Sequence, residues 1–336
     1  MKKNPTILTF TALLLIFSAL TFSAHAENEV KVGVYYYPWY TGNWEQDHPN
    51  CIDTPVLGHY NSQDVTVIRK HLEWLQDLDV DFLIVSWWGP NSFTDNTTKT
   101  LFSTANAEET SIEITIMIEP FNSSSGIYNF TLLYDYIYST YVSQYDNLYM
   151  KLYGRPLICF YNDNVNMTKN GKIPLDDRFE VRIIGHEPYA NWLYSRNYQM
   201  TSWENELAMD GQISVMPRYD DTHFRSPGAQ KDPTYSQGYY DQQWNKALNL
   251  ARQGKVHYVT IATWNEFAER TQIEPCIDKT SYKKNEPYFI YEKTKQYIAR
   301  IKSPTPQVPT EMVAVFGTLA IALTATLKIL KTATTT

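Results

Sequence analysis

The chain has 336 residues and a formal net charge of −7 at pH 7, and its 43% hydrophobic and 19% charged content is that of a globular protein. Without the two ends described below, residues 27–303 keep 25 of the 29 basic and 35 of the 36 acidic residues, a net charge of −10. This acidic balance argues against a surface that binds nucleic acid or anionic membranes.

The first 26 residues have the pattern of a secretory signal peptide rather than of a domain element. Lys2 and Lys3 precede an apolar run, and Ala24-His25-Ala26 provides a small-residue cleavage site. We therefore expect residues 1–26 to be removed on export. The alternative is an uncleaved anchor at the N-terminus.

Between residues 27 and 303, short β-rich runs alternate with helical patterns, and no linker or internal repeat divides them. Helices are predicted after a capping Asp64 and over residues 128–142, 239–251 and 287–301. Eight strands with helices between them predict an α/β fold, a single (β/α)8 barrel of TIM type with irregular units in its second half. The predicted strands, of which the sixth has the weakest pattern, are 31–38, 81–87, 112–119, 156–161, 180–186, 199–203, 212–217 and 257–264.

The C-terminal segment is expected to anchor this domain in a membrane. Residues 304–311 form a proline-rich, stiff spacer. Residues 312–330 are apolar apart from Lys328 and would span roughly 28 Å as a helix, close to the hydrocarbon thickness of a bilayer. A signal peptide in front and lysines behind place the tail 331–336 in the cytoplasm and the domain outside, at the cell surface. The alternative is a terminal helix packed on the domain.

Cysteines and glycosylation acceptors agree with export. Three cysteines are too few for a disulfide-built scaffold, and Cys159 lies in a predicted buried strand. Cys51 and Cys276 lie in loops that follow the first and eighth strands, which are neighbours in a closed barrel. We therefore expect these two thiols to meet and to be able to pair in an oxidising exterior. The four acceptor asparagines are Asn96, Asn122, Asn129 and Asn166.

Aromatic and acidic residues gather where the predicted strands end, which is where barrel enzymes have their active sites. Aromatic rings offer flat faces to sugar C–H groups, and carboxylates bind hydroxyls or transfer protons, so these residues predict a carbohydrate site at one rim. The alternative is packing for the tryptophans and a structural hydrogen bond for His186. The candidates are Tyr36, Tyr37, Trp39, Tyr40, Trp87, Trp88, Glu119, His186, Glu187, Tyr189, Trp203, Glu204, the run 218–221, Glu266 and Glu269.

A pair of glutamates in the segment TWNEFAERTQIEP is the strongest single signal. Glu266 and Glu269 follow the last strand by a few residues, and at positions i and i+3 of a turn both carboxyls can face one cavity. Glycoside hydrolysis commonly needs two carboxyl groups, one of which protonates the leaving oxygen. Two acids held close together have different pKa values, which leaves one protonated near neutrality. The alternative is a solvated loop face.

Other chemistries have less support. The histidines show no H-x-x-x-H or H-x-H spacing, and Asp220-Asp221 by itself is weak evidence for a hard-cation site, so no metal is predicted. No GxSxG, Walker A or GxGxxG motif is present, which argues against acyl transfer and against nucleotide or dinucleotide cofactors.

The order of the motifs resembles glycoside hydrolase family 99, the endo-α-1,2-mannosidases and endomannanases, over nearly all of residues 31–276. The resemblance rests on the segments VGVYYYPWY, GHYNSQDVTVIRKHLEWLQDLDVDFLIVSWWG, ITIMIEPFN, YGRPLICFYN, SVMPRYDDTHFRSP, GYYDQQWNKAL and TWNEFAERTQIEP.

This resemblance implies a (β/α)8 barrel that retains anomeric configuration and needs no metal or other cofactor. It implies that Glu266 deprotonates the 2-hydroxyl of a mannoside, which attacks the anomeric carbon to give a 1,2-anhydro sugar, and that Glu269 protonates the leaving oxygen and then activates water. The expected partner is an α-mannoside glycan or polysaccharide, and the expected state is a monomer. Substrate contacts are expected from Tyr40, Trp87, Trp88, Glu119, Tyr219 and, from their places at the rim and beside the acids, His186, Glu187, Asp220 and Asn265.

The chain departs from the family pattern beside the acids. Where the family has WNEWHEGTQIE, this chain has Phe267, Ala268 and Arg270 in place of tryptophan, histidine and glycine. These changes put the exact linkage in question, and Arg270 is a candidate contact for an acidic sugar. The competing functions are a retaining glycosidase with direct double displacement, whose Asn-Glu pair usually follows the fourth strand, and a non-catalytic glycan-binding surface protein.

Overall fold

The computed structural model describes residues 29–121, 128–162, 166, 168, 170–185, 190–194, 207–281, 283 and 285–303. The predicted signal peptide 1–26, spacer 304–311, anchor 312–330 and tail 331–336 lie outside these residues. In the part of the chain that is described, no helix has the length and apolar character needed to cross a membrane.

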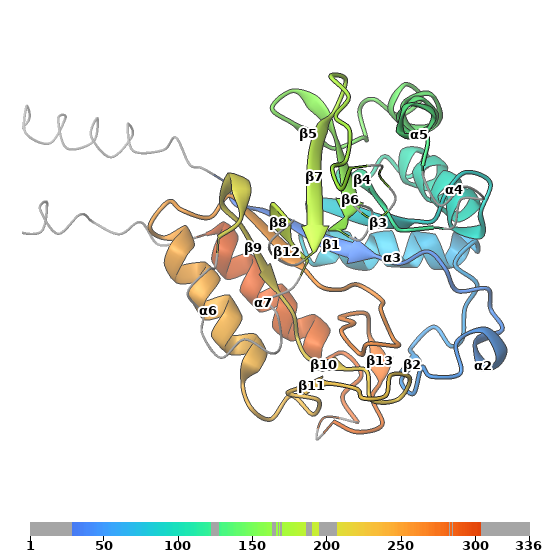
Figure 1. Cartoon of the computed structure of the whole chain (residues 1–336). Helices are drawn as coiled ribbons and strands as arrows, with labels where there is room; N and C mark the ends of the chain where they lie inside the picture. Colours follow the sequence, from blue (N-terminus) through green and yellow to red (C-terminus); the bar gives the residue numbers. More distant parts are fainter. Residues whose placement is uncertain are drawn as a thin grey trace, which may run out of the picture.

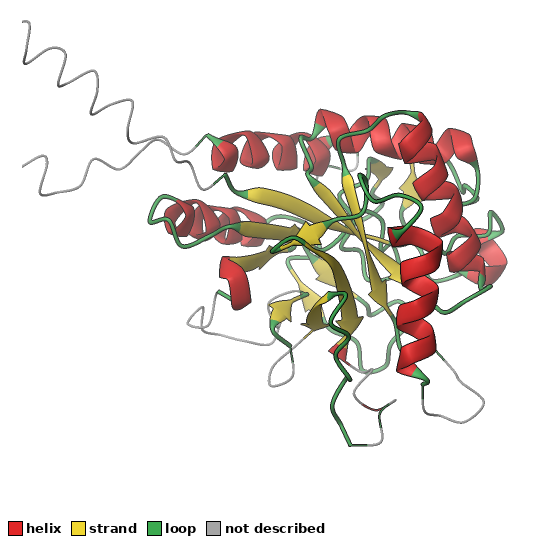
Figure 2. Cartoon of the chain, turned by 90° about the horizontal axis from the view of Figure 1, so that it is seen from above, coloured by secondary structure: helices red, strands yellow, loops and turns green. Residues whose placement is uncertain are grey.

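Eight parallel strands form a nearly closed barrel with helices on its outside (Figure 2). The strands lie in the order β8-β7-β6-β4-β3-β1-β12-β9, so consecutive strands of the chain are mostly neighbours. This arrangement confirms the predicted (β/α)8 fold. The strand bounds are β1 (Lys31–Tyr36), β3 (Phe82–Trp87), β4 (Glu113–Ile118), β6 (Arg155–Tyr161), β7 (Glu180–Gly185), β8 (Trp192–Leu193), β9 (Gln212–Val215) and β12 (Tyr258–Ile261).

Helices connect the strands in the first half and after β9, whereas the described residues between β6 and β9 contain no α-helix, only 3-10 turns such as η3 (Met209–Gly211). The predicted irregular units therefore lie at β6, β7 and β8. The helices, labelled in Figure 1, are α2 (Trp44–Asp47), α3 (Val65–Asp77), α4 (Phe93–Ala107), α5 (Phe130–Ile137) with its π-helical extension η1 (Tyr138–Val142), α6 (Tyr239–Ala251) and α7 (Phe289–Lys302).

The strands pack on both faces because successive side chains alternate between the barrel interior and the helices. Leu83 and Val85 of β3 belong to the core beneath the helices, while Phe82 and Ile84 belong to the core inside the barrel. Gly33 of β1 lies directly beside the Phe82 ring, and a Cβ at this position would be 2.2 Å from ring carbon Cε2. Because both faces of each strand are packed, the strand sequences are nearly continuous runs of apolar residues.

Local signals set the helix ends. The Asp64 carboxylate accepts a hydrogen bond from Thr66 N at 2.8 Å and caps α3, as predicted. The predicted helix 239–251 coincides with α6, and α7 begins two residues later than the predicted helix 287–301. Helix α4 was not predicted, because its threonines and asparagines do not give a clear apolar period.

One strand of the ring was not predicted. Strand β8, at Trp192–Leu193, pairs with β7, and the predicted sixth strand, 199–203, lies outside the described residues. A two-residue strand gives almost no period-2 pattern in sequence, which explains why β8 was missed.

Side chains join β8 to β9 and complete the ring. Leu193 N donates to Gln212 Oε1 and Gln212 Nε2 donates to Leu193 O, both at 2.9 Å. Ser214 Oγ adds a bond to Tyr194 O at 2.6 Å. The backbone ladder therefore has a gap that one glutamine and one serine bridge.

Two small two-stranded antiparallel sheets lie beyond the strand ends, and the second is a hairpin (Figure 1). Strand β2 (Thr54–Pro55) pairs with β13 (Cys276–Ile277), and β10 (Tyr219–Asp220) pairs with β11 (Gln230–Lys231). A further short strand, β5 (Lys151–Leu152), pairs with β6. The β10–β11 hairpin touches the turn after β12, since Asp220 N donates to Glu269 O at 2.9 Å.

The predicted disulfide is not formed. Cys51, Cys159 and Cys276 are all free thiols, although Cys51 packs against the small aromatic cluster that contains Cys276. The sequence therefore predicted that Cys51 and Cys276 come near each other, but not that they are unbonded. Cys159 is buried in β6, as expected.

Candidate active site

A cavity of about 390 Å³ opens where several barrel strands end. It is walled by side chains that follow β1, β3, β4, β6, β8 and β12, together with the β10–β11 hairpin. The lining residues are Tyr37, Trp39, His48, Trp88, Glu119, Tyr161, Tyr194, Phe224, Arg225, Glu266, Ala268 and Glu269. Both predicted catalytic glutamates therefore face the same space.

Hydrogen bonds within the turn after β12 fix the position of Glu266. Glu266 N donates to Thr263 Oγ1 at 2.9 Å, and Thr271 N donates to Glu266 O at 3.2 Å, so the residue is fixed at both ends. Its Oε1 atom accepts from Ala268 N at 2.9 Å and from Glu269 N at 3.4 Å. The carboxyl group thereby satisfies peptide N–H groups that the tight turn leaves free.

Asn265 supports the turn from below rather than facing the cavity. It is fully buried, its Oδ1 accepts from Tyr37 N at 2.8 Å, and its Nδ2 donates to Tyr37 O at 2.9 Å. This two-bond pairing ties the turn after β12 to the end of β1. Tyr40 acts in the same way: it is fully buried and its hydroxyl donates to Asn265 O at 2.7 Å.

Glu269 is held by side chains of a different element. Its Oε1 atom accepts from Arg225 NH1 at 2.8 Å, and the Tyr219 hydroxyl lies 3.5 Å away. The same Arg225 nitrogen also contacts the Tyr219 hydroxyl at 2.7 Å and Asp221 Oδ2 at 2.8 Å. The hairpin that carries these residues therefore determines the environment of the second acid.

The surroundings raise the pKa of both glutamates. Burial raises the pKa of Glu266 well above its ordinary value, and the negative charge of Glu269 adds to this, while the two peptide N–H donors oppose it. Burial also raises the pKa of Glu269, but Arg225 opposes this directly. Two acids with raised and mutually dependent pKa values suit proton transfer near neutral pH.

Aromatic rings that follow β1 and β3 form a further part of the cavity wall. Trp88 is 38% exposed, and its ring centroid is 6.4 Å from that of Trp39, which in turn packs on Tyr37 at 4.5 Å. An exposed indole at the mouth of a cavity offers the flat apolar face that a sugar ring needs. Glu119 follows β4, the strand that pairs with β3, and its Oε1 accepts from Ser86 Oγ at 2.8 Å.

The structure separates the predicted substrate contacts into three groups. Trp88 and Glu119 line the cavity, and Tyr219 contacts Glu269. Four predicted contacts do not line it: Tyr40 and Asn265 lie beneath the turn, Trp87 is fully buried with its Nε1 donating to Asp95, and Asp220 binds Arg270. His186 and Glu187 lie outside the described residues, as do the rim residues Tyr189, Trp203 and Glu204.

Alternation explains why Trp87 and Trp88 differ. Successive residues at a strand end point to opposite faces, so only one of two adjacent tryptophans can face the cavity. Burial explains Asp220: the guanidinium of Arg270 lies 2.9 Å from Asp220 Oδ2, so the carboxylate belongs to a buried ion cluster. Burial opposes its ionisation, yet hydrogen bonds from Thr222, Gln230 and Arg270 lower the pKa of Asp220 to about 2.

Arg270 does not reach the cavity, so the expectation that it contacts an acidic sugar is wrong. Its side chain is fully buried and its nitrogens bond to Asp53, Asp220 and Asp278. The cation that does line the cavity is Arg225.

Some lining residues were not among the predicted contacts. Tyr161 ends β6, so the rule that sites lie at strand ends was sufficient to find it. Tyr194 was missed because β8, the strand before it, was not predicted. His48, Phe224 and Arg225 lie in loops, and their sequence pattern does not distinguish them from surface residues.

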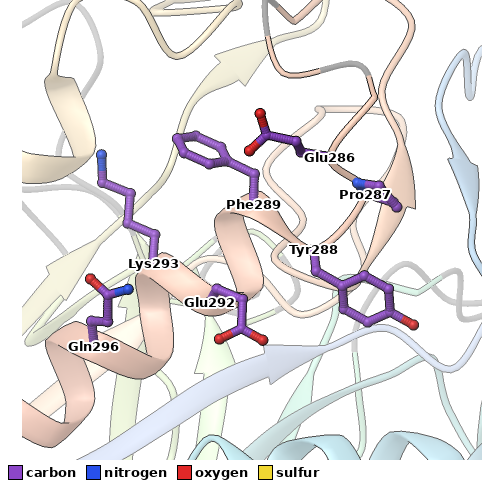
Figure 3. A pocket seen from close by; sticks show the side chains of 7 residues that line it. All are labelled: Glu286, Pro287, Tyr288, Phe289, Glu292, Lys293 and Gln296. Atoms are coloured by element: carbon purple, nitrogen blue, oxygen red, sulfur yellow. The ribbon is translucent and has the colours of Figure 1, made fainter.

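A second hollow, of about 470 Å³, lies on the outside of the barrel at the start of α7 (Figure 3). Figure 3 shows Lys293 and Gln296 along the helix, with Phe289, Glu286 and Tyr288 near its first turn. Lys293 pairs with Asp241, and the described lining comes from residues 286–296 rather than from the strand ends where barrel enzymes have their active sites. The cavity with the two glutamates is therefore the better candidate site. Among the residues that the structure describes, no group of three potential ligands could hold a metal ion.

Sequence comparisons show that this chain is similar to glycoside hydrolases. The model of glycosyl hydrolase family 99 matches residues 41–173, which end before the turn with the two glutamates. The mouse "glycoprotein endo-alpha-1,2-mannosidase-like protein" is 25% identical over 275 residues, 68% of this chain and 58% of the relative. The mouse "glycoprotein endo-alpha-1,2-mannosidase" is 24% identical over 298 residues, 72% of this chain and 62% of the relative. The chain thus spans about three-fifths of the length of these relatives.

Structure comparisons confirm the fold. The endo-alpha-mannosidase of glycoside hydrolase family 99 from Bacteroides thetaiotaomicron, solved in complex with bis-tris-propane, superposes with a TM-score of 0.60 at 22% identity. The match covers 81% of this chain and 97% of the bacterial one. A glycoside hydrolase-like protein matches with a TM-score of 0.54 at 13% identity and 79% coverage of this chain.

Proposed function

Since this chain is a protein similar to glycoside hydrolase family 99, we propose that it is a retaining, endo-acting glycoside hydrolase that cleaves α-mannosidic linkages in glycans or polysaccharides. The observation that carries this proposal is the pair of glutamates, three residues apart on one turn, that face a single cavity at the strand ends of the barrel. The relatives named above are endo-α-mannosidases, which supports mannose as the sugar.

We propose that Glu266 and Glu269 divide the proton transfers. Glu266 takes the proton of the mannoside 2-hydroxyl while that oxygen attacks the anomeric carbon, and Glu269 gives a proton to the glycosidic oxygen as its bond to carbon breaks. The product at this stage is a 1,2-anhydro sugar. Glu269 then removes a proton from water as the water attacks the anomeric carbon, and Glu266 returns its proton to the 2-oxygen. Two inversions at one carbon give net retention.

The contacts of the two acids differ, and their division of roles follows from the resemblance to glycoside hydrolase family 99. Two peptide N–H bonds favour the ionised form of Glu266, which a base needs, but burial outweighs them and raises its pKa. Among the described residues, the side chains of Arg225 and Tyr219 are the hydrogen-bond partners of the Glu269 carboxyl, which can exchange them for a glycosidic oxygen and a water. Trp88, Trp39 and Glu119 would hold the sugar in the cavity, through ring stacking and hydroxyl bonds.

The direct test is incubation of the protein with a panel of α-mannosides and mannans, with product size measured by chromatography and anomeric configuration by NMR. We expect internal cleavage and an α-configured first product. The Glu266→Gln and Glu269→Gln proteins are the matched controls. Binding without turnover by the native protein would instead identify a glycan-binding protein.

A 2-fluoro analogue tests the chemistry of the first step. If the substrate's own 2-oxygen is the nucleophile, an activated 2-fluoro mannoside binds but is not cleaved and leaves no covalent adduct. Intact-protein mass spectrometry after incubation gives the readout. A stable adduct on Glu266 would show direct double displacement, the ordinary mechanism of retaining glycosidases.

We also propose that the protein is exported and held at the cell surface as a monomer by a helix over residues 312–330. The support comes from the sequence: an A-x-A site at 24–26, an apolar segment, and lysines that follow it. Expression of the full chain in a secretory host, N-terminal sequencing, and carbonate extraction of membranes test this. Release of the intact protein by carbonate would exclude the anchor.

A further inference from the structure

Five charged side chains are buried together beside the turn that carries the two glutamates. They come from separate parts of the chain: the loop before β2, the segment before β10, β10 itself, the turn after Glu269, and the residue after β13. All are at most 7% exposed, and they are Asp53, Arg218, Asp220, Arg270 and Asp278.

Arg270 is at the centre of this cluster. Its Nε donates to Asp53 Oδ2 at 3.0 Å, its NH1 to Asp220 Oδ2 at 2.9 Å and its NH2 to Asp278 Oδ1 at 3.0 Å. Each nitrogen thus reaches a different carboxylate, which the planar fork of an arginine can do and the single ammonium group of a lysine cannot. The second arginine binds the backbone of the first, because Arg218 Nε donates to the carbonyl oxygen of Arg270 at 2.7 Å.

Stability alone is a weak reason for this arrangement. Removing charges from water costs free energy that their mutual attraction often does not exceed, so packed apolar residues would serve a barrel equally well. Arg270 also has a backbone φ of +56°, in the left-handed region where glycine is favoured. A bulky residue is therefore kept at a strained position so that its guanidinium can enter the cluster.

The cluster holds the hairpin against the acid turn. Asp220 N donates to Glu269 O at 2.9 Å, while the Asp220 carboxylate binds the next residue, Arg270. Tyr219 precedes Asp220 on β10, and Arg225 follows in the same hairpin, and both contact the Glu269 carboxyl. The place of Tyr219 and Arg225 beside the acid therefore depends on the anchoring of Asp220.

We propose that Arg270 is a positioning residue of this site, which fixes the β10–β11 hairpin so that Tyr219 and Arg225 stay in contact with Glu269. The inference rests on the proposed function for its kinetic consequences, but its geometric part does not. Arg270 touches no substrate in this scheme. It acts through Asp220 and the hairpin on the second acid.

The test compares Arg270→Lys and Arg270→Gly with the native protein. The glycine variant removes the guanidinium and also relieves the backbone strain, while the lysine variant keeps the charge and loses the fork. We expect both to lower kcat at least about tenfold with KM changed by less than about threefold, because orientation rather than substrate binding is lost. We also expect the alkaline limb of the kcat/KM profile to move to higher pH, since Arg225 no longer holds down the pKa of Glu269.

A double variant separates positioning from a general loss of structure. If Arg270 acts through Arg225, adding Arg270→Lys to Arg225→Ala should move the alkaline limb no further than Arg225→Ala alone. Arg182→Lys is the matched control: Arg182 is 4% exposed and bonds to Asp210 at 2.7 Å, and neither residue lines the cavity. An unmoved pH profile in both Arg270 variants, or an equal effect of Arg182→Lys, would overturn the proposal.

A crystal structure of Arg270→Lys gives a readout without activity, and Arg270→Gly serves if the lysine variant does not fold. We expect the bond from Arg225 NH1 to Glu269 Oε1 to be lost. An intact bond would refute the inference even if the proposed function holds. If the native protein cleaves no α-mannoside but this bond is lost in the variant, the proposed function fails while the positioning role stands.

Discussion

The two glutamates differ because one is bound by its own turn and the other by a neighbouring hairpin. Glu266 accepts from the peptide N–H groups of residues 268 and 269, whereas Glu269 depends on Arg225. A spacing of three residues could be read from the sequence, but these partners could not, because the turn and the hairpin meet only in the folded barrel. At the residue scale, this difference leads to three predictions.

Replacing either acid by its amide should remove catalysis and leave the fold intact. We expect Glu266→Gln and Glu269→Gln each to lower kcat by about 10²–10⁴-fold, the range for loss of a general acid or base. The amides keep the shape of the side chain, and circular dichroism checks folding. Near-native turnover by both variants would refute the assignment.

Glu266→Gln should also stabilise the protein at neutral pH. Burial and the charge of Glu269 raise the pKa of Glu266 in the folded state above its ordinary 4.5. As the pH rises above about 4, the unfolded chain ionises at this position while the folded protein resists, so the native protein loses stability that the amide does not. Thermal unfolding should show a higher Tm for the variant at pH 7, with the difference vanishing near pH 4. A difference that does not change with pH would contradict this account.

Arg225 should set the alkaline limit of activity. Its guanidinium opposes the effect of burial on Glu269 and so lowers the pKa of that acid. In Arg225→Ala the pKa of Glu269 rises, so the acid stays protonated to higher pH and the alkaline limb of kcat/KM moves upward. Arg225→Lys keeps the charge and is the control, with a smaller shift expected. A downward shift in the alanine variant would show that Glu269 is not the acid on that limb.

At the scale of elements, the sequence predicted the helices and strands that have a regular apolar period and missed those that lack one. The long apolar periods of α3 and α6 predicted both helices closely. Helix α4 was missed because threonines and one aspartate share its buried face with the apolar residues, and β8 was missed because two residues show no period. Tertiary contacts, not local propensity, form these two elements.

Asp95 illustrates how α4 is held. It is fully buried, and its carboxylate accepts from Trp87 Nε1 at 2.9 Å, Lys99 Nζ at 2.7 Å and Tyr141 OH at 2.5 Å. Burial opposes ionisation, but these bonds outweigh it and keep the pKa of Asp95 below its usual range. The bonds join α4 to β3 and to η1.

Asp95→Asn should therefore lower the free energy of unfolding by about 3 kcal/mol, as expected when one member of a buried charged network is removed. Denaturant titration measures this. Asp77→Asn is the control: Asp77 also accepts from a tyrosine and a lysine, but its side chain is 48% exposed, so the expected loss is under about 1 kcal/mol. Equal effects of the two substitutions would contradict the role of burial.

For the molecule as a whole, the sequence predicted the barrel because eight strand patterns at regular intervals leave few other architectures. It predicted the rim on which the site lies, because parallel strands bring their carboxyl ends together. It did not predict which side chains of that rim face inward. Tyr40, Trp87, Asn265 and Asp220 support the site from beneath it, and sequence does not record which way a side chain points.

All described residues that line the cavity lie between Tyr37 and Glu269. A chain comprising residues 27–303 should therefore fold alone and keep the kcat/KM of the full-length protein within about twofold. We expect it to stay in the supernatant after ultracentrifugation of cells that express it, whereas the full chain pellets with membranes. A tenfold loss of kcat/KM would show that the terminal segments contribute to the site.

The join between β8 and β9 makes the ring uneven. Elsewhere the strands share a backbone ladder, but here the chain relies on one glutamine amide and one serine hydroxyl. Local unfolding begins where the fewest backbone hydrogen bonds must break, so we expect the barrel to open first between β8 and β9. The amide protons at this junction should then exchange faster than those of β3 and β4. Tyr194, which directly follows β8, lines the cavity, and its hydroxyl accepts a hydrogen bond from the Tyr37 hydroxyl at 2.9 Å. The β8–β9 junction is therefore next to the cavity wall. The width of the cavity beside Tyr194 depends on whether the side-chain bonds of this junction are formed.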